Sequence, residues 1–109
     1  MNNRIKIDNV YSLELDKSTF VSSLIILNIY EFDNKIYSMK VSPQIFSSIL
    51  TTCSYLEGSK SFKTVLGDDI ILNKESKDII LFKINKINLR LSVKNIEDLL
   101  DNFVKIISN

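Results

Sequence analysis

The chain of 109 residues contains no histidine, alanine or tryptophan, and it has only two glycines, one proline and one cysteine. Without histidine, the most common general base and a frequent zinc ligand are missing. Gly58 and Gly67 stand too far apart to form a glycine-rich phosphate loop. Because Cys53 is the only cysteine, no internal disulfide can form, which favours a reducing compartment and a cytoplasmic location. We therefore expect no enzymatic activity and no cofactor.

The sequence also lacks an excess of positive or negative charge, and it lacks long apolar runs. The net charge is +1, which is not the strongly basic balance typical of many nucleic-acid-binding proteins. No apolar run reaches the roughly 18 residues of a membrane span, and the N-terminus lacks the apolar segment of a signal peptide, so we expect no membrane contact. The chain is rich in Ile, Asn, Lys and Ser, a composition that is typical of proteins encoded by AT-rich genes. Our hypothesis is a low-GC bacterial, phage or other viral source, with the host cytoplasm as the location if viral.

The sequence does contain an internal repeat. Residues 24–27 read Leu-Ile-Ile-Leu and residues 78–81 read Asp-Ile-Ile-Leu, and each is followed by a short apolar segment and a helix-like run. A shift of 50 places the apolar positions of residues 37–56 on those of residues 87–106, with almost no identity. This register extends across a strand and a helix, whose periods differ, so it is not expected by chance. The pattern predicts a duplicated unit.

Each half reads as four strands followed by a helix. Alternating or β-branched segments predict strands over residues 4–7, 10–15, within 19–32, 36–41, 62–66, 69–72, 78–84 and 87–93, with a polar turn at 73–76. Ser42 and Pro43 are typical of a helix start, and residues 57–61 are expected to end that helix. For the last helix we expect Asn95 as the cap.

The two expected helices carry apolar positions at helical spacing, which predicts one buried stripe on each. The stripes comprise Phe46, Ile49, Leu50, Cys53 and Leu56 in the first helix, and Ile96, Leu99, Leu100, Phe103, Ile106 and Ile107 in the second. Glu97 and Asp98 are expected in the first turn of the second helix, where acids are favourable.

These patterns predict an α+β fold made of two β-β-β-β-α repeats, in which a pseudo-symmetric sheet structure carries two helices. The first repeat covers about residues 4–57 and the second about residues 62–108. The chain length allows one domain, residues 1–109.

The segment Ile36-Tyr-Ser-Met-Lys-Val-Ser-Pro-Gln-Ile-Phe-Ser-Ser-Ile-Leu50 resembles the strand-to-helix corner of the positive cofactor four family of transcriptional coactivators. Pro43 and Phe46 match the proline at the helix start and the bulky aromatic residue that follows it. Leu24 to Tyr30 is similar to the apolar third strand of that family. The β-β-β-β-α order also resembles the Whirly and Pur-alpha proteins. The resemblance implies binding of single-stranded nucleic acid on a sheet surface.

Basic residues are concentrated in the second repeat, where no acid occurs between residues 79 and 96. Cations along a strand can follow phosphates, and nearby rings can stack on bases. Phe32 and Tyr37 are further rings in the chain. We predict a nucleic-acid site made of Lys40, Lys83, Lys86, Arg90, Lys94, Tyr30 and Phe82. The alternatives are that the lysines protect a solvated strand edge and that the rings pack in the core.

Two further groups of residues could carry chemistry, but simpler interpretations exist for both. Asp68, Asp69 and the run Glu75-Ser76-Lys77 have the residue types of a metal-dependent nuclease, although turn chemistry explains them more simply. We predict no metal site. Cys53 lies on an apolar helical stripe and is interpreted as a small core residue.

Two functions remain open from the sequence. The first is a non-catalytic protein that binds single-stranded nucleic acid, supported by the repeat, by the Ser42-Pro43 corner and by the basic run. The second is a small protein-binding module, such as an inhibitor, immunity factor or assembly factor, supported by the near-neutral charge. We expect a homodimer in either case, because each half alone has a shallow core.

Overall fold

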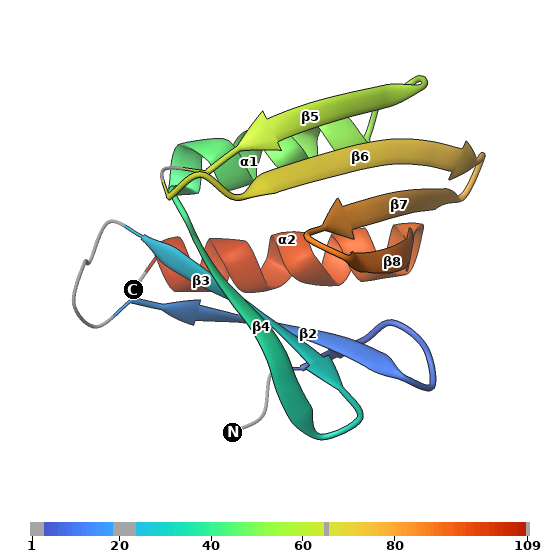
Figure 1. Cartoon of the computed structure of the whole chain (residues 1–109). Helices are drawn as coiled ribbons and strands as arrows, with labels where there is room; N and C mark the ends of the chain where they lie inside the picture. The colour runs from blue at the N-terminus through green and yellow to red at the C-terminus, as the bar shows by residue number, and fades with distance from the viewer. Residues whose placement is uncertain (1–3, 19–23, 65, 109) are drawn as a thin grey trace.

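The computed structural model describes residues 4–18, 24–64 and 66–108, and Figure 1 shows its two β-β-β-β-α repeats. The elements in these ranges are β1 (Ile5–Lys6), β2 (Tyr11–Lys17), β3 (Ile25–Glu31), β4 (Asn34–Val41), α1 (Pro43–Cys53), β5 (Ser59–Lys63), β6 (Asp69–Ser76), β7 (Ile79–Ile84), β8 (Ile87–Ser92) and α2 (Val93–Ile107). Strands β1–β4 form one antiparallel sheet in sequence order, and β5–β8 form a second. The predicted α+β class with two repeated units is confirmed.

The two repeats share one apolar core because α2, the helix of the second repeat, packs against the sheet of the first. It contacts β1 and β2 as well as α1 and β8, so it lies between the two sheets (Figure 1). The side-chain amide of Asn95 in α2 donates to the backbone oxygen of Lys6 in β1 at 3.2 Å. The rings of Phe46 in α1 and Phe103 in α2 lie 5.2 Å apart between centroids. Neither helix in the described ranges is long and apolar enough to cross a lipid bilayer.

Strand pairing shows which residues of the two repeats are equivalent. Leu27 in β3 pairs with Met39 in β4, and Phe82 in β7 pairs with Leu89 in β8. Met39 and Leu89 stand at the same distance before their helices, so Leu27 is equivalent to Phe82. The predicted match of residues 24–27 with 78–81 is therefore wrong by one residue. A slip of one residue exchanges the two faces of a strand, and this error would have placed core residues on the surface.

The two hairpins differ in length, which explains the slip. The β3–β4 hairpin has a register shift after Ile29 and a turn that holds Phe32 in a left-handed conformation, with φ of 55°. In the β7–β8 hairpin, Ile84 pairs directly with Ile87 around a two-residue turn. A constant shift along the sequence cannot follow two hairpins of different length.

Alternation along the strands separates an inner apolar face from an outer face in each sheet. The inner residues meet the buried sides of both helices. They include Leu13, Leu15, Ile25, Leu27, Ile29, Met39 and Val41 from the first sheet and Ile70, Leu72, Ile80, Phe82, Ile84, Leu89 and Leu91 from the second. Of the predicted basic residues, Lys40, Lys83 and Arg90 stand on the outer faces.

The helix starts follow capping chemistry, with one correction. At α1, the Ser42 hydroxyl accepts from the backbone N–H of Ile45 at 3.2 Å, as predicted. At α2, Ser92 is the N-cap, and its hydroxyl accepts from the N–H of Asn95 while the Asn95 side chain accepts from the N–H of Ser92. The prediction of Asn95 as the cap is wrong because this reciprocal pair starts the helix three residues earlier. Glu97 and Asp98 therefore lie beyond the first turn.

Three other boundaries differ from the expected ones. Helix α1 ends at Cys53, before the expected stop at residues 57–61, because Ser54 caps it through its own N–H and hydroxyl. Strand β5 begins at Ser59, directly after Gly58 takes a left-handed φ of 80°. Residues 73–76 continue β6 through a bulge instead of forming a turn. The stretch 19–23 of an expected strand lies outside the described residues.

Candidate nucleic-acid interface

The outer face of the second sheet carries two of the five predicted basic residues, Lys83 and Arg90. Phe82 and Ile84 point into the core, so Lys83 between them points outward. Lys83 pairs with Ile71 on one side and with Asn88 on the other, and Arg90 stands beside Leu81. This outer face comprises Ser59, Ser61, Lys63, Asp69, Ile71, Asn73, Glu75, Leu81, Lys83, Asn88 and Arg90.

Ion pairs occupy two of the three cations on this face. The Arg90 Nε atom lies 2.7 Å from a Glu75 carboxylate oxygen, and this pair joins β8 to β6 across β7. The Lys63 ammonium lies 3.0 Å from an Asp69 oxygen. Lys83 makes no ion pair with another described residue, and it is exposed. Lys83 is therefore the cation most available to an added anion.

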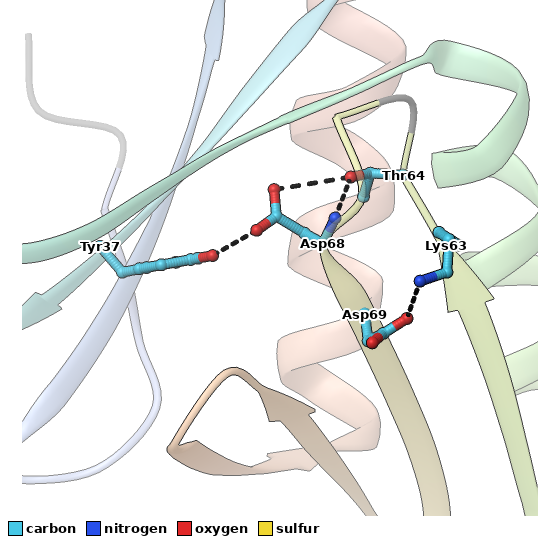
Figure 2. Close-up of polar contacts among 5 residues, drawn as sticks. All are labelled: Tyr37, Lys63, Thr64, Asp68 and Asp69. Atoms are coloured by element: carbon cyan, nitrogen blue, oxygen red, sulfur yellow. Dashed lines mark hydrogen bonds and ion pairs between the residues drawn. The ribbon is translucent and has the colours of Figure 1, made fainter.

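Lys83 also lines a cleft of about 450 Å³ at the junction of the two repeats. The cleft is lined by Tyr37, Gly67, Asp68, Asp69, Ile71, Lys83 and Asn85. Figure 2 shows the Tyr37 ring reaching from β4 toward Asp68, which precedes β6. The Tyr37 hydroxyl donates to one Asp68 carboxylate oxygen at 2.5 Å. Thr64 contacts the other Asp68 oxygen at 3.5 Å and accepts from the Asp68 N–H at 3.0 Å.

The hydrogen bonds at this cleft affect the titration of Tyr37. The bond to Asp68 is the largest cause that raises the pKa of Tyr37 to about 12, followed by burial and by the Asp68 charge. The carboxylates of Asp68 and Asp69 already accept from Tyr37 and pair with Lys63, respectively (Figure 2). The Lys83 ammonium and the exposed Asn85 amide remain as donors toward a ligand.

The structure brings only part of the predicted basic set together. Lys86 is exposed in the β7–β8 turn, next to the strands that hold Lys83 and Arg90. Lys94 stands on α2, where its ammonium lies 2.7 Å from an Asp98 oxygen, and this bond raises the pKa of Lys94. Lys40 is half-buried on the outer face of the first sheet, beside Ile26. Lys83, Lys86 and Arg90 thus form one group, and Lys40 and Lys94 lie outside it.

The two predicted stacking rings are not free. Phe82 is 1% exposed and belongs to the core, so the alternative interpretation, in which the ring packs in the core, is correct for Phe82. Tyr30 is 9% exposed, the Arg4 guanidinium lies 3.7 Å from the centre of its ring, and its hydroxyl donates to Glu14 at 3.0 Å. Phe32, at the tip of the β3–β4 hairpin, is 63% exposed. The ring of Phe32 is thus more accessible to a base than either predicted ring.

The outer face of the first sheet holds a polar network that sequence reasoning missed. Asn28 is buried and is the equivalent of Lys83. Its amide nitrogen donates to Glu14 at 3.1 Å and to Asp16 at 3.2 Å, and the Ser38 hydroxyl donates to its oxygen. Burial, and then the nearby Glu14 charge, raise the pKa of Asp16. The alternation of Glu14 and Asp16 along β2 was the available signal. These carboxylates make the first sheet less favourable to phosphates.

The acids considered for a metal site have separate partners. Asp68 and Asp69 stand at the start of β6, and Glu75 stands near its far end, bound to Arg90. Within the described residues, no three Cys, Asp or Glu side chains gather in a metal-binding group. Cys53 is half-buried, and burial raises the pKa of its thiol to about 11. A thiol in this state is a poor nucleophile at neutral pH.

No protein-family model, curated protein or solved structure matches this chain. The resemblance of residues 36–50 to the positive cofactor four corner therefore stays a prediction.

Proposed function

We propose that this protein binds single-stranded nucleic acid without catalysing a reaction, and that the outer face of the second sheet is the binding surface. The observation that carries the proposal is the exposed Lys83 ammonium, which has no ion-pair partner among the described residues and stands over the cleft between the repeats. Lys86 and Arg90 lie on the same hairpin. A phosphate near Lys83 would be within reach of these two further cations.

The surroundings of Lys83 also suit a single strand better than a duplex. Ile71 supplies partly exposed apolar surface, and Asn73 and Asn88 supply amides that can donate to and accept from base edges. Unpaired bases can offer their Watson–Crick edges to such groups directly, whereas pairing in a duplex occupies those edges. Arg90 must release Glu75, or bind it and the phosphate together, before it contributes fully to phosphate binding. We therefore expect Lys83 to contribute most to the binding energy. A cytoplasmic location is part of this proposal.

Fluorescence anisotropy with a labelled single strand of about 25 nucleotides tests this function. The wild type is expected to bind at low salt and to lose affinity as salt rises from about 50 to about 200 mM. The variant Lys83→Gln/Lys86→Gln/Arg90→Gln is expected to weaken binding at least tenfold. Three lost phosphate contacts would also reduce the salt slope by about 2.

The matched control is Lys6→Gln/Lys35→Gln/Lys60→Gln, which removes the same charge from exposed lysines away from the outer face of the second sheet. If this control weakens binding as much as the first variant, the effect comes from net charge and the site assignment is wrong. If the wild type does not bind at low salt, the proposed function is wrong.

One observation favours the second candidate, a protein-binding module. Helix α2 exposes large apolar side chains, with Val93, Leu100, Val104 and Ile107 each about half exposed. Surfaces of this kind commonly bind protein. Helix α2 packs on the inner sides of the sheets, so this surface and the outer face of the second sheet are separate.

A further inference from the structure

Helix α2 is apolar on a wider arc than the protein covers. Leu99 and Phe103 are buried, as predicted, whereas Leu100 and Ile107 are 47% and 52% exposed and do not belong to the buried stripe. Val93 and Val104, which were not part of that stripe, are also about half exposed. We call Val93, Ile96, Leu100, Val104 and Ile107 the α2 stripe; Ile96 is half-buried at its border with the core.

The α2 stripe borders two hollows. A groove of about 400 Å³ lies beside its N-terminal half, and its apolar lining comprises Leu50, Cys53, Ile80, Val93, Ile96 and Leu100. A smaller hollow of about 260 Å³ lies at its C-terminal end, beside Ile25, Pro43 and Ile107. The groove also has a polar lining, which comprises Ser54, Lys74, Lys77, Asp78 and Glu97. The apolar positions of the stripe extend along the helix, which favours a long partner helix over a compact ligand.

The spacing of the α2 stripe is symmetric about its centre. Counted from Leu100, the apolar positions stand four and seven residues away in both directions. An antiparallel copy of α2 therefore places Leu100 against Leu100 of the second copy, Val93 against Ile107, and Ile96 against Val104. Every apolar position meets an apolar position, as a two-fold interface requires.

The charges beside the stripe distinguish antiparallel from parallel packing. Glu97 and Lys105 are exposed on the same side of α2, and neither forms an ion pair with another described residue. Antiparallel packing puts this side of both helices on the same edge of the interface, so that Glu97 of each copy lies near Lys105 of the other. Parallel packing puts it on opposite edges, where these charges cannot pair. Asp101 lies between Glu97 and Lys105 around the helix, and antiparallel packing brings the Asp101 side chains of the two copies toward each other, which limits the affinity.

We propose that a second copy of this chain covers the α2 stripe, with the two α2 helices antiparallel and crossing at Leu100. The interface is isologous, and two Glu97–Lys105 pairs flank its apolar centre. The outer faces of both sheets stay open in this dimer, because α2 packs on their inner sides. The proposal therefore does not depend on the nucleic-acid function.

Sedimentation velocity and light scattering over a range of concentrations test the dimer. The wild type is expected to reach twice the chain mass at micromolar concentration. Leu100→Asp is expected to weaken association at least a hundredfold, because every dimer loses two buried leucines. Leu66→Asp is the matched control, since Leu66 is 66% exposed and lies off the stripe. Circular dichroism verifies that both variants are folded. A wild type that stays monomeric at high concentration, or a control that dissociates equally, overturns the proposal.

Two further measurements test the direction of the helices. Glu97→Lys and Lys105→Glu are each expected to weaken the dimer, and the double variant is expected to restore it. In a Cys53→Ser background, Leu100→Cys is expected to form a disulfide between copies on oxidation. Val104→Cys is not, because antiparallel packing separates its two copies by about 12 Å along the helix axis. Equal crosslinking at both positions indicates parallel packing and overturns the antiparallel assignment, as does a double variant without rescue.

Discussion

Replacing Tyr37 with phenylalanine removes the hydroxyl that joins the first repeat to the second at the cleft. That hydroxyl donates to the Asp68 carboxylate at 2.5 Å. A hydrogen bond to a charged group contributes about 1.5–3 kcal/mol when it is well sheltered. Tyr37 is only half-buried, so we reduce this to about 1–2 kcal/mol. We expect Tyr37→Phe to lower the free energy of unfolding by that amount at pH 8, measured by urea denaturation.

The pH dependence of this difference gives a sharper test. The pKa of Tyr37 is raised to about 12 in the folded protein, against an ordinary value of about 10 for an unfolded chain. The folded state therefore favours the protonated hydroxyl, and its contribution is complete below pH 10. Between about pH 10 and about pH 12 the unfolded chain loses the proton first, so the contribution declines. The stability difference between wild type and Tyr37→Phe should shrink over that interval.

Two controls separate the hydrogen bond from other effects. Tyr55→Phe changes a tyrosine that is 63% exposed, and it should alter stability by less than about 0.5 kcal/mol. A double-mutant cycle with Asp68→Asn should show a coupling energy of about 1–2 kcal/mol. A stability difference that stays constant up to pH 12, or a coupling near zero, would refute the reasoning.

Two further predictions concern the helix start and the first sheet. Ser92→Ala removes the capping pair with Asn95 and should reduce stability by about 1 kcal/mol in urea denaturation, whereas Ser47→Ala on the exposed side of α1 should not reduce it. Asp16→Asn should raise Tm at pH 7, because the raised pKa of Asp16 shows that the fold disfavours its charge; the gain should vanish near pH 3, where the wild-type acid is protonated. No gain at pH 7 would contradict the view that burial and the nearby Glu14 charge disfavour the ionised form of Asp16.

The duplicated architecture could be predicted because the apolar period in each half is regular. Met39 and Leu89, for instance, both precede a serine-capped helix by the same number of residues, and both are buried. The alignment of β3 with β7 failed because the apolar pattern indicates neither the lengths of the two hairpins nor the bulge after Ile29. Pairing partners, which the sequence does not state, settle such a register.

Residues of the candidate site were predictable only in part. Alternation along β8 places Asn88 and Arg90 on one face, and only the pairing of Lys83 with Asn88 adds Lys83 to that face. Whether a cation is free depends on long-range partners, and Glu75 reaches Arg90 from fifteen residues away in the sequence. The burial of Phe82 and the stacking of the Arg4 guanidinium on the Tyr30 ring also depend on tertiary structure. Helix α2 shows the converse: Leu100 has the spacing of a core residue and is nonetheless half exposed.

Equivalent positions of the two repeats differ in a way that bears on function. In the core, equivalent positions are apolar in both repeats; Phe82, for example, is the equivalent of Leu27. On the outer faces, the equivalents of Lys83 and Ile71 are Asn28 and Glu14, so at these positions the first sheet has one cation fewer and one carboxylate more. An anionic ligand is therefore expected to distinguish the two sheets, so that each chain offers one phosphate-binding face. In the proposed dimer two such faces would be related by a two-fold axis. A strand long enough to span both would then bind more tightly than a short one, because its second contact is intramolecular.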